Sequence, residues 1–156
     1  MNKLSFLFLF LLVFLFNGCN STTSGTLSPQ KRVVDVKKDY YTGGMLRSEF
    51  FMYDKTGMNG LRKMYGYKGS LLSKVEIQNG VPNGNETLYD DEGRVRLVKP
   101  YVNGRIDGVA TVYYDNGTPK MTITYVKGVK HGPAAKYNPD GSVFEKKMFQ
   151  HGKAIN

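Results

Sequence analysis

The sequence has no tryptophan, a single cysteine and only two histidines among its 156 residues. One cysteine excludes an internal disulfide and a zinc site built from several cysteines. The short motifs of a serine-hydrolase elbow, a phosphate-binding loop and a zinc-protease helix are missing as well. No segment carries the apolar stripe and caps of an amphipathic helix. The sequence therefore gives no sign of the enzyme classes that depend on these features.

Glycine and tyrosine are abundant instead, with 18 and 11 residues. Glycine supplies the positive φ angles of tight turns, and tyrosine suits the half-buried surface of a sheet. Basic residues outnumber acidic ones by 22 to 13, which gives a net charge of +9. This composition predicts short strands joined by tight turns, in at most one modest domain with appendages.

The N-terminal segment MNKLSFLFLFLLVFLFNGC has the organisation of an export signal. Lys3 gives it a short positive start, and residues 4–16 are apolar apart from one serine. As a helix this run would span only about 20 Å, at about 1.5 Å per residue. A bilayer core is about 30 Å thick, so the run is short for a membrane span and suits a signal peptide.

The end of this segment resembles a bacterial lipoprotein signal. Cys19 is the only cysteine, Gly18 precedes it and Leu15 stands four positions before it. Phe16 and Asn17 depart from the usual residues of such a signal. The resemblance implies cleavage before Cys19 and a lipid on its sulfur, whereas the alternative is an ordinary signal peptide or an uncleaved anchor.

A tether follows the predicted signal. Residues 20–30 are rich in serine, threonine, glycine and proline, which is the composition of a flexible linker. The segment KRVVDVKK at 31–38 alternates briefly and has two interpretations. It is either a first edge strand or a basic stalk near anionic headgroups.

A 24-residue period governs the rest of the chain, with three glycine phases and two aromatic phases. The glycine phases are Gly60, Gly84, Gly108 and Gly132; Gly69, Gly93, Gly117 and Gly141; and Gly80, Gly104, Gly128 and Gly152. The aromatic phases are Tyr41, Tyr65, Tyr89, Tyr113 and Tyr137; and Tyr53, Ile77, Tyr101, Tyr125 and Phe149. Agreement across five phases marks an array of repeats.

Each period contains two strands and two turns. Residues 109–114 and 118–126 alternate as strands do, and the Asp-Asn-Gly between them is a strong hairpin turn. The first unit is out of step, because Gly44 and Gly57 each fall one residue off the period. Compensating one-residue shifts in its two turns would explain this, and terminal repeats are commonly atypical.

These residues resemble the MORN repeat family in its bacterial variant. The segment YVKGVKHGPAAKYNPDGSVFEKKMFQHG follows the family pattern of aromatic residues alternating with K-G, H-G and D-G pairs, while Ile77, Asn85 and Pro133 depart from it. The resemblance implies an all-β fold, an elongated single-layer antiparallel β-meander of about five 24-residue hairpin repeats. The predicted organisation is a lipoprotein signal peptide (1–18), a lipid anchor and flexible tether (19–38) and a MORN-like repeat domain (39–156).

The two aromatic phases are expected to form ladders across the sheet, because an isolated hairpin is marginal in water and needs its neighbours. In the structural interpretation these rings are the core of a thin sheet. In the functional interpretation they leave a concave, tyrosine-rich face open to a partner. Tyr67 and Tyr114 lie outside the ladder phases and are better candidates for exposed contacts.

Neither histidine predicts catalysis. His131 and His151 occupy different phases, so the period does not place them together, and His131 belongs to a repeat turn. The acidic run at residues 90–92 lacks the spacing of a calcium loop and is interpreted as a solvated turn. We expect no cofactor, no metal site and no enzymatic activity.

Basic residues complete the candidate interaction surface. Together with the two exposed tyrosines, it comprises Tyr67, Tyr114, Arg62, Lys63, Arg94, Arg96, Lys120 and Lys136. Basic residues that are spread over the surface usually keep a protein soluble and prevent its edge strands from pairing with other chains. Beside a membrane, the same charge is attracted to anionic lipid or cell-wall polymer. Export argues against nucleic acid as the partner.

The sequence thus predicts a membrane-anchored, non-enzymatic repeat module that contacts an envelope protein, a lipid or a wall polymer in a bacterial envelope. If the host has two membranes, the outer one is expected, because Asn20 is not an aspartate retention signal. The alternative implied by the resemblance is an antitoxin or immunity protein that neutralises a partner toxin. An enzyme is a third class, which would require a hydrolytic activity dependent on His131 or His151.

Overall fold

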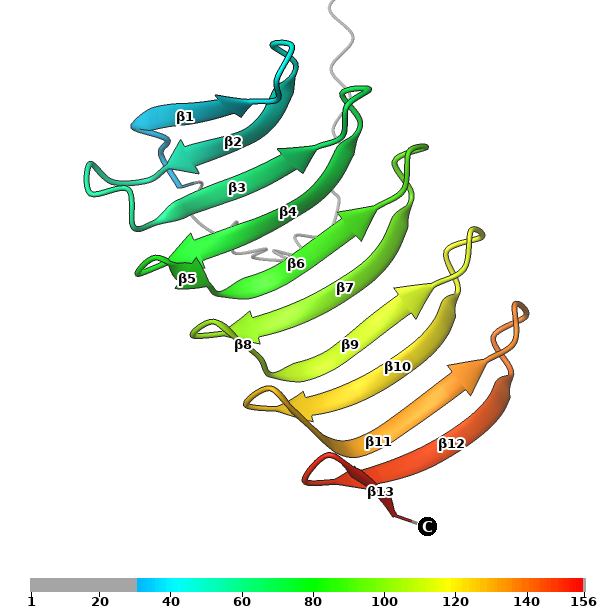
Figure 1. Ribbon diagram of the computed structural model, residues 1–156. Helices are drawn as coiled ribbons and strands as arrows, with labels where there is room; N and C mark the ends of the chain where they lie inside the picture. The colour runs from blue at the N-terminus through cyan, green and yellow to red at the C-terminus, as the bar shows by residue number, and fades with distance from the viewer. Residues whose placement is uncertain (1–30, 156) are drawn as a thin grey trace, which may run out of the picture. The chain divides into compact units, whose positions relative to one another are not determined.

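The computed structural model describes residues 31–155, and their regular structure consists of strands alone. Thirteen antiparallel strands form one open sheet (Figure 1). The strands are β1 (Asp35–Tyr40), β2 (Leu46–Met52), β3 (Gly60–Tyr65), β4 (Leu71–Gln78), β5 (Val81–Pro82), β6 (Gly84–Tyr89), β7 (Val95–Val102), β8 (Arg105–Ile106), β9 (Gly108–Tyr113), β10 (Pro119–Val126), β11 (Val129–Tyr137), β12 (Val143–Gln150) and β13 (Lys153–Ile155). The predicted all-β meander is confirmed. The predicted signal peptide, Cys19 and the start of the tether lie outside the described residues.

The strands succeed one another across the sheet in chain order (Figure 1). Five hairpins stand side by side, namely β1–β2, β3–β4, β6–β7, β9–β10 and β11–β12. The short strands β5 and β8 lie off this path and pair with β4 and β7. β1 begins at Asp35, so the last residues of the segment KRVVDVKK form an edge strand.

Each hairpin closes with the same tight turn. In the second hairpin the N–H of Gly69 donates to the carbonyl of Gly66 at 2.9 Å, and Gly69 has a φ of +81°. A glycine in this left-handed conformation lets the chain return with one extra residue, a bulge typical of short hairpin loops. The register accordingly shifts between Met64 and Tyr65. The other hairpins carry the same shift beside their own tyrosine.

The turns at the opposite strand ends connect successive hairpins to each other. Asn79 and Gly80 have φ angles of 51° and 80°, as a two-residue hairpin turn requires. The N–H of Gly80 then donates to the carbonyl of Met58 in the preceding turn, at 2.8 Å. Gly104, Gly128 and Gly152 make the equivalent bond to the preceding unit, at 2.7–2.9 Å. A chain of backbone bonds therefore runs along this side of the sheet.

The first hairpin is one residue out of step, as predicted, and this corrects the membership of both ladders. Tyr40 pairs with Leu46 as Tyr65 pairs with Leu71, so Tyr40 takes the place expected for Tyr41. Met52 lies in the row of Gly60 and Ile77, so it takes the place expected for Tyr53. The reason is that the first turn begins one residue early, and the loop over residues 53–59 restores the period.

The two predicted ladders lie on opposite faces of the sheet. Paired residues of antiparallel strands share a face, and successive residues alternate between faces. One face, here the glycine face, pairs Gly60, Gly84, Gly108 and Gly132 with Ile77, Tyr101, Tyr125 and Phe149. Tyr65 stands five positions after Gly60 and so points the other way. The opposite, tyrosine face carries Tyr40, Tyr65, Tyr89, Tyr113 and Tyr137.

The buried core is small and lies on the glycine face of the first two hairpins. Met52, Val75 and Ile77 are 4%, 6% and 2% exposed. Gly60 allows the close approach of their neighbours, because a Cβ there would stand 2.4 Å from the carbonyl oxygen of Phe51. Most other residues are half-buried or exposed, since the sheet has no second layer within the described residues.

Candidate interaction surface

A polar network covers the tyrosine face over β1–β4. The hydroxyl of Tyr65 donates to the carboxylate of Glu49 at 2.6 Å, and the Lys38 ammonium lies 3.4 Å from the same carboxylate. The Tyr65 hydrogen bond, aided by Lys38 and Lys63, lowers the pKa of Glu49 against the opposing effect of burial. Burial and the bond to Glu49 raise the pKa of Tyr65 to about 12. At neutral pH both groups are fixed in one protonation state, which suits a structural contact.

Lysines on this face lie over aromatic rings. The ammonium of Lys63 is 4.6 Å from the ring centroid of Phe51, and that of Lys74 is 5.7 Å from the ring centroid of Tyr89. A cation over a ring face is attracted by about 0.5–1 kcal/mol at exposed sites. These lysines are therefore partly engaged with the protein itself.

Over β9–β12 the tyrosine face changes character and forms a shallow groove of about 700 Å³. Uncharged side chains line most of it, among them Thr122, Thr124, Pro133, Ala135 and Met148. Tyr137 also lines the groove, and its hydroxyl lies 3.5 Å from that of Thr122. Lysines 146 and 147 bound the groove. It is open apolar surface with hydroxyl groups in reach, which suits contact with another molecule.

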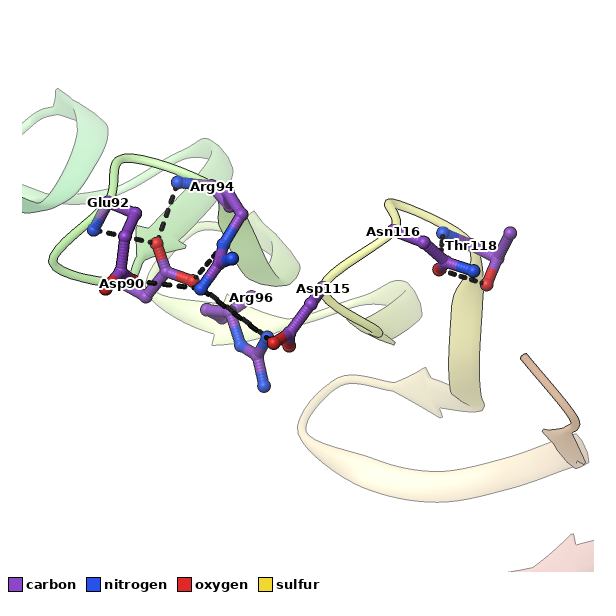
Figure 2. Close-up of polar contacts among 7 residues, drawn as sticks. All are labelled: Asp90, Glu92, Arg94, Arg96, Asp115, Asn116 and Thr118. Atoms are coloured by element: carbon purple, nitrogen blue, oxygen red, sulfur yellow. Dashed lines mark hydrogen bonds and ion pairs between the residues drawn. The ribbon is translucent and has the colours of Figure 1, made fainter.

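The hairpin tips form a second candidate region. Arg94 donates to Asp90 at 2.8 Å and to Glu92 at 2.9 Å within one tip, while Arg96 pairs with Asp115 of the next tip (Figure 2). The Arg96 hydrogen bond lowers the pKa of Asp115. Desolvation opposes a similar effect at Asp90, but the Arg94 contacts outweigh it and lower the pKa of that carboxyl. The cluster therefore joins two neighbouring tips by charge.

Other tips are joined through tyrosines. Tyr67 stacks on Tyr41 with ring centroids 4.3 Å apart, and it remains 56% exposed. The hydroxyl of Tyr114 donates to the carbonyl of Tyr137 at 2.8 Å, and the Lys120 ammonium lies 5.4 Å from the Tyr114 ring centroid. Both predicted contact tyrosines thus stand at tips and connect one repeat to the next, but Tyr114 is half-buried rather than exposed.

The structure distributes the residues of the predicted surface over three regions. Arg62 and Lys136 stand on the glycine face, where Lys136 pairs with Glu145 at 2.7 Å. Lys63 stands on the tyrosine face. The hairpin-tip region has Tyr67, Tyr114, Arg94, Arg96 and Lys120. The predicted set is therefore not one continuous patch.

Sequence reasoning missed the groove, because threonine, proline and alanine carry no recognisable chemistry. The available signal was a period-2 row of uncharged residues, Thr122 and Thr124 on β10 beside Pro133 and Ala135 on β11. Such a row marks a stretch of one face without charged side chains.

The period was not expected to place the two histidines together, but the structure brings them into contact. The ring centroids of His131 and His151 are 5.3 Å apart, and the rings meet edge to face at 72°. Each connecting turn folds back onto the preceding one, as shown by the bond from the Gly152 N–H to the Lys130 carbonyl. Residues of different phases therefore become neighbours across the repeat boundary.

Within residues 31–155 no group of three or more histidine, cysteine, aspartate or glutamate side chains is placed to hold a metal ion. The same residues contain no helix that is long and apolar enough to cross a membrane.

Comparison with protein families finds a match within the repeat domain. Residues 106–127, which include β9 and β10, match the family model described as the MORN repeat variant. Modules of this family are in general non-catalytic and are consistent with contacts to proteins or membranes. A search of curated proteins finds no match to the chain.

Proposed function

Because the chain contains a MORN repeat variant, we propose that it is a lipid-anchored, non-enzymatic interaction module of a bacterial cell envelope. The groove on the tyrosine face over β9–β12 is the main support for an interaction role. It leaves apolar side chains of several strands uncovered on one contiguous surface. Exposed apolar area of this kind is typical of binding surfaces.

The lipid anchor is supported by the position of the only cysteine. Cys19 follows an apolar run of signal-peptide length, and residues 20–30 have linker composition. The twelve steps from Cys19 to Lys31 limit the reach of this linker to about 40 Å. Lys31 itself is held on the sheet, 3.2 Å from the Glu76 carboxylate and over the ring of Tyr53. An anchored sheet would therefore stay close to the membrane surface.

Metabolic labelling with a radioactive fatty acid tests the anchor. We expect label in the wild-type protein, recovered in the membrane fraction, and none in the Cys19→Ala variant. A soluble, unlabelled wild-type protein would overturn the anchored model. Cys19→Ser serves as the matched control, because it keeps a polar group of similar size and should behave as Cys19→Ala does.

Site-specific photocrosslinking in intact cells tests the interaction surface. A crosslinker at Thr122 faces the groove, whereas one at the adjacent Met121 faces the glycine side. We expect a discrete adduct from position 122 and none from position 121. Equal adducts from both positions, or none from either, would contradict a role for the groove.

A further inference from the structure

Two histidine side chains meet at the C-terminal end of the sheet. His131 lies in β11, and His151 lies in the turn between β12 and β13. Their ring centroids are 5.3 Å apart at an interplanar angle of 72°. The neighbouring Lys130 places its ammonium 5.4 Å from the ring centroid of Phe149.

The same two positions form a contact pair in earlier repeats. The N–H of Asn79 donates to the side-chain oxygen of Asn59 at 3.0 Å, and that of Asn103 to the side-chain oxygen of Asn83 at 3.1 Å. His151 stands one and three repeat steps after Lys127 and Asn79, and it shares their left-handed φ, at 49° against 49° and 51°. The backbone therefore holds this pair of positions in the same way in successive repeats, and only the last unit fills both with imidazoles.

The separation of the two rings agrees with a shared metal ion. Zinc binds an imidazole nitrogen at about 2.0–2.1 Å, which places it about 3.2 Å from the ring centroid. A tetrahedral angle at the metal then separates two coordinating rings by about 5.2 Å. Imidazole is a preferred ligand of zinc, copper and nickel, whereas calcium and magnesium prefer oxygen.

We propose that His131 and His151 form a two-histidine site for a divalent transition metal of the zinc class. The chain supplies two ligands, and water or donor groups of another molecule complete the coordination. The site stands where β13 covers only the last residues of β12, so it is accessible from the C-terminal edge of the sheet. It does not depend on lipidation of Cys19 or on the groove.

Calorimetric titration with zinc chloride tests the site. The protein is the full chain in detergent, without a histidine tag, and every version carries Cys19→Ser so that no thiol competes. We expect one zinc ion per chain. The single variants His131→Asn and His151→Asn should bind about 10–100-fold more weakly or not at all, since even outer-shell partners of a metal contribute that much.

Asparagine is the matched replacement, because the chain itself places asparagines at both positions in two of its earlier repeats. A thermal melt by circular dichroism without metal should therefore leave both variants close to the parent protein. A parent protein (Cys19→Ser) that binds no zinc, or histidine variants that bind it as tightly as the parent, would overturn the proposal.

A gain-of-function variant tests the geometry independently. Asn83 and Asn103 occupy the positions that are equivalent to His131 and His151, two repeats earlier in the chain. Replacing both, as Asn83→His with Asn103→His, should create a second zinc site with a stoichiometry of two per chain. A stoichiometry that stays at one would contradict the claim that these two backbone positions define the site.

Discussion

The first two hairpins and the last two are built from the same repeat, yet they differ in what they bury. All three buried side chains of the described residues, Met52, Val75 and Ile77, belong to β2 and β4. At the other end, Phe144 of β12 is 68% exposed, and β13 pairs with only three residues of that strand. The periodic sequence alone does not produce this difference.

An irregular loop over residues 53–59 distinguishes the first two hairpins from the later ones. This loop lies against the core, since the Met52 side chain comes within 3.4 Å of the position of a Cβ on Gly57. Ahead of β1, the N–H of Val34 also donates to the Met52 carbonyl at 2.8 Å. The repeats supply strands to a shared sheet, but a side chain on a single-layer sheet is buried only where another part of the chain covers it. At this end of the sheet, the departure from the period therefore adds contacts to Met52 that the regular repeats do not have.

The largest effect is expected from truncating the same residue type at the two ends. Ile77→Ala removes a side chain that is 2% exposed and should destabilise the protein by about 2–5 kcal/mol. Ile123 lies on the same face but is only half-buried. Ile123→Ala should therefore destabilise the protein by only about 1–2 kcal/mol, because the substitution removes less buried apolar surface. Urea unfolding measures both losses. Equal losses would show that the two ends are equally packed.

A smaller effect is expected from adding a methyl group to Gly60. Gly60→Ala places a Cβ 2.4 Å from a backbone oxygen of Phe51 and 2.6 Å from the Phe50 ring. Overpacking of this kind typically costs about 1–3 kcal/mol. The control is Gly117→Asn at a hairpin tip, where nothing lies within 4 Å and asparagine tolerates the positive φ of 82°. If both variants lower the urea midpoint equally, the close approach at Gly60 is not what stabilises the first hairpins.

Repeat period, strand alternation and turn composition predicted the strands and turns of each unit, and the resemblance to the MORN repeat family implied their arrangement in one sheet of five hairpins. The same signals failed to assign ladder positions in the first hairpin, where the turn is shifted by one residue. Tyr41 and Tyr53 keep the 24-residue step in the sequence, but the early first turn gives their places to Tyr40 and Met52. A one-residue shift exchanges the faces of all following side chains, so periodicity without turn geometry cannot assign faces.

The candidate surfaces were less predictable than the fold. The period reports which residues occupy equivalent places, but not which places meet across a repeat boundary. His131 and His151 have different phases and still contact each other, because each connecting turn hydrogen-bonds to the preceding one. The groove was missed for another reason, since its threonines and alanine are recognisable only once the tyrosine face is known.

A pH-dependent effect of intermediate size is expected at the tyrosine face. Tyr65→Phe removes the donor to Glu49 and should cost about 0.5–1.5 kcal/mol at pH 7. The pKa of Glu49 is lowered from its usual 4.5, so the bond contributes fully above that value and is lost as the pH falls through the folded-state pKa. The pKa of Tyr65 is raised from 10.0 to about 12, so on the alkaline side the contribution is full below pH 10 and lost toward pH 12.

Urea unfolding from pH 3 to pH 8 measures this difference between wild type and variant. The matched control is Tyr89→Phe, the same ladder position one repeat later, which should change stability little at any pH. A difference between wild type and Tyr65→Phe that stays constant down to pH 3 would contradict the role of the Glu49 carboxylate.

The smallest effect is expected from the contacts between neighbouring hairpin tips, which differ in kind along the sheet. Ion pairs join the third and fourth tips, since Arg96 binds Asp115. Neutral hydrogen bonds join the fourth and fifth, since the Asn116 amide donates to the Pro139 carbonyl at 3.0 Å. Arg96→Gln should cost less than about 1 kcal/mol in dilute buffer, and the cost should disappear near 1 M salt, where charges are screened beyond about 3 Å. Asn116→Ala should cost a similar amount that salt does not change. Thermal melts at low and high salt compare the two, and a salt-independent loss in Arg96→Gln would show that its contribution is packing rather than charge.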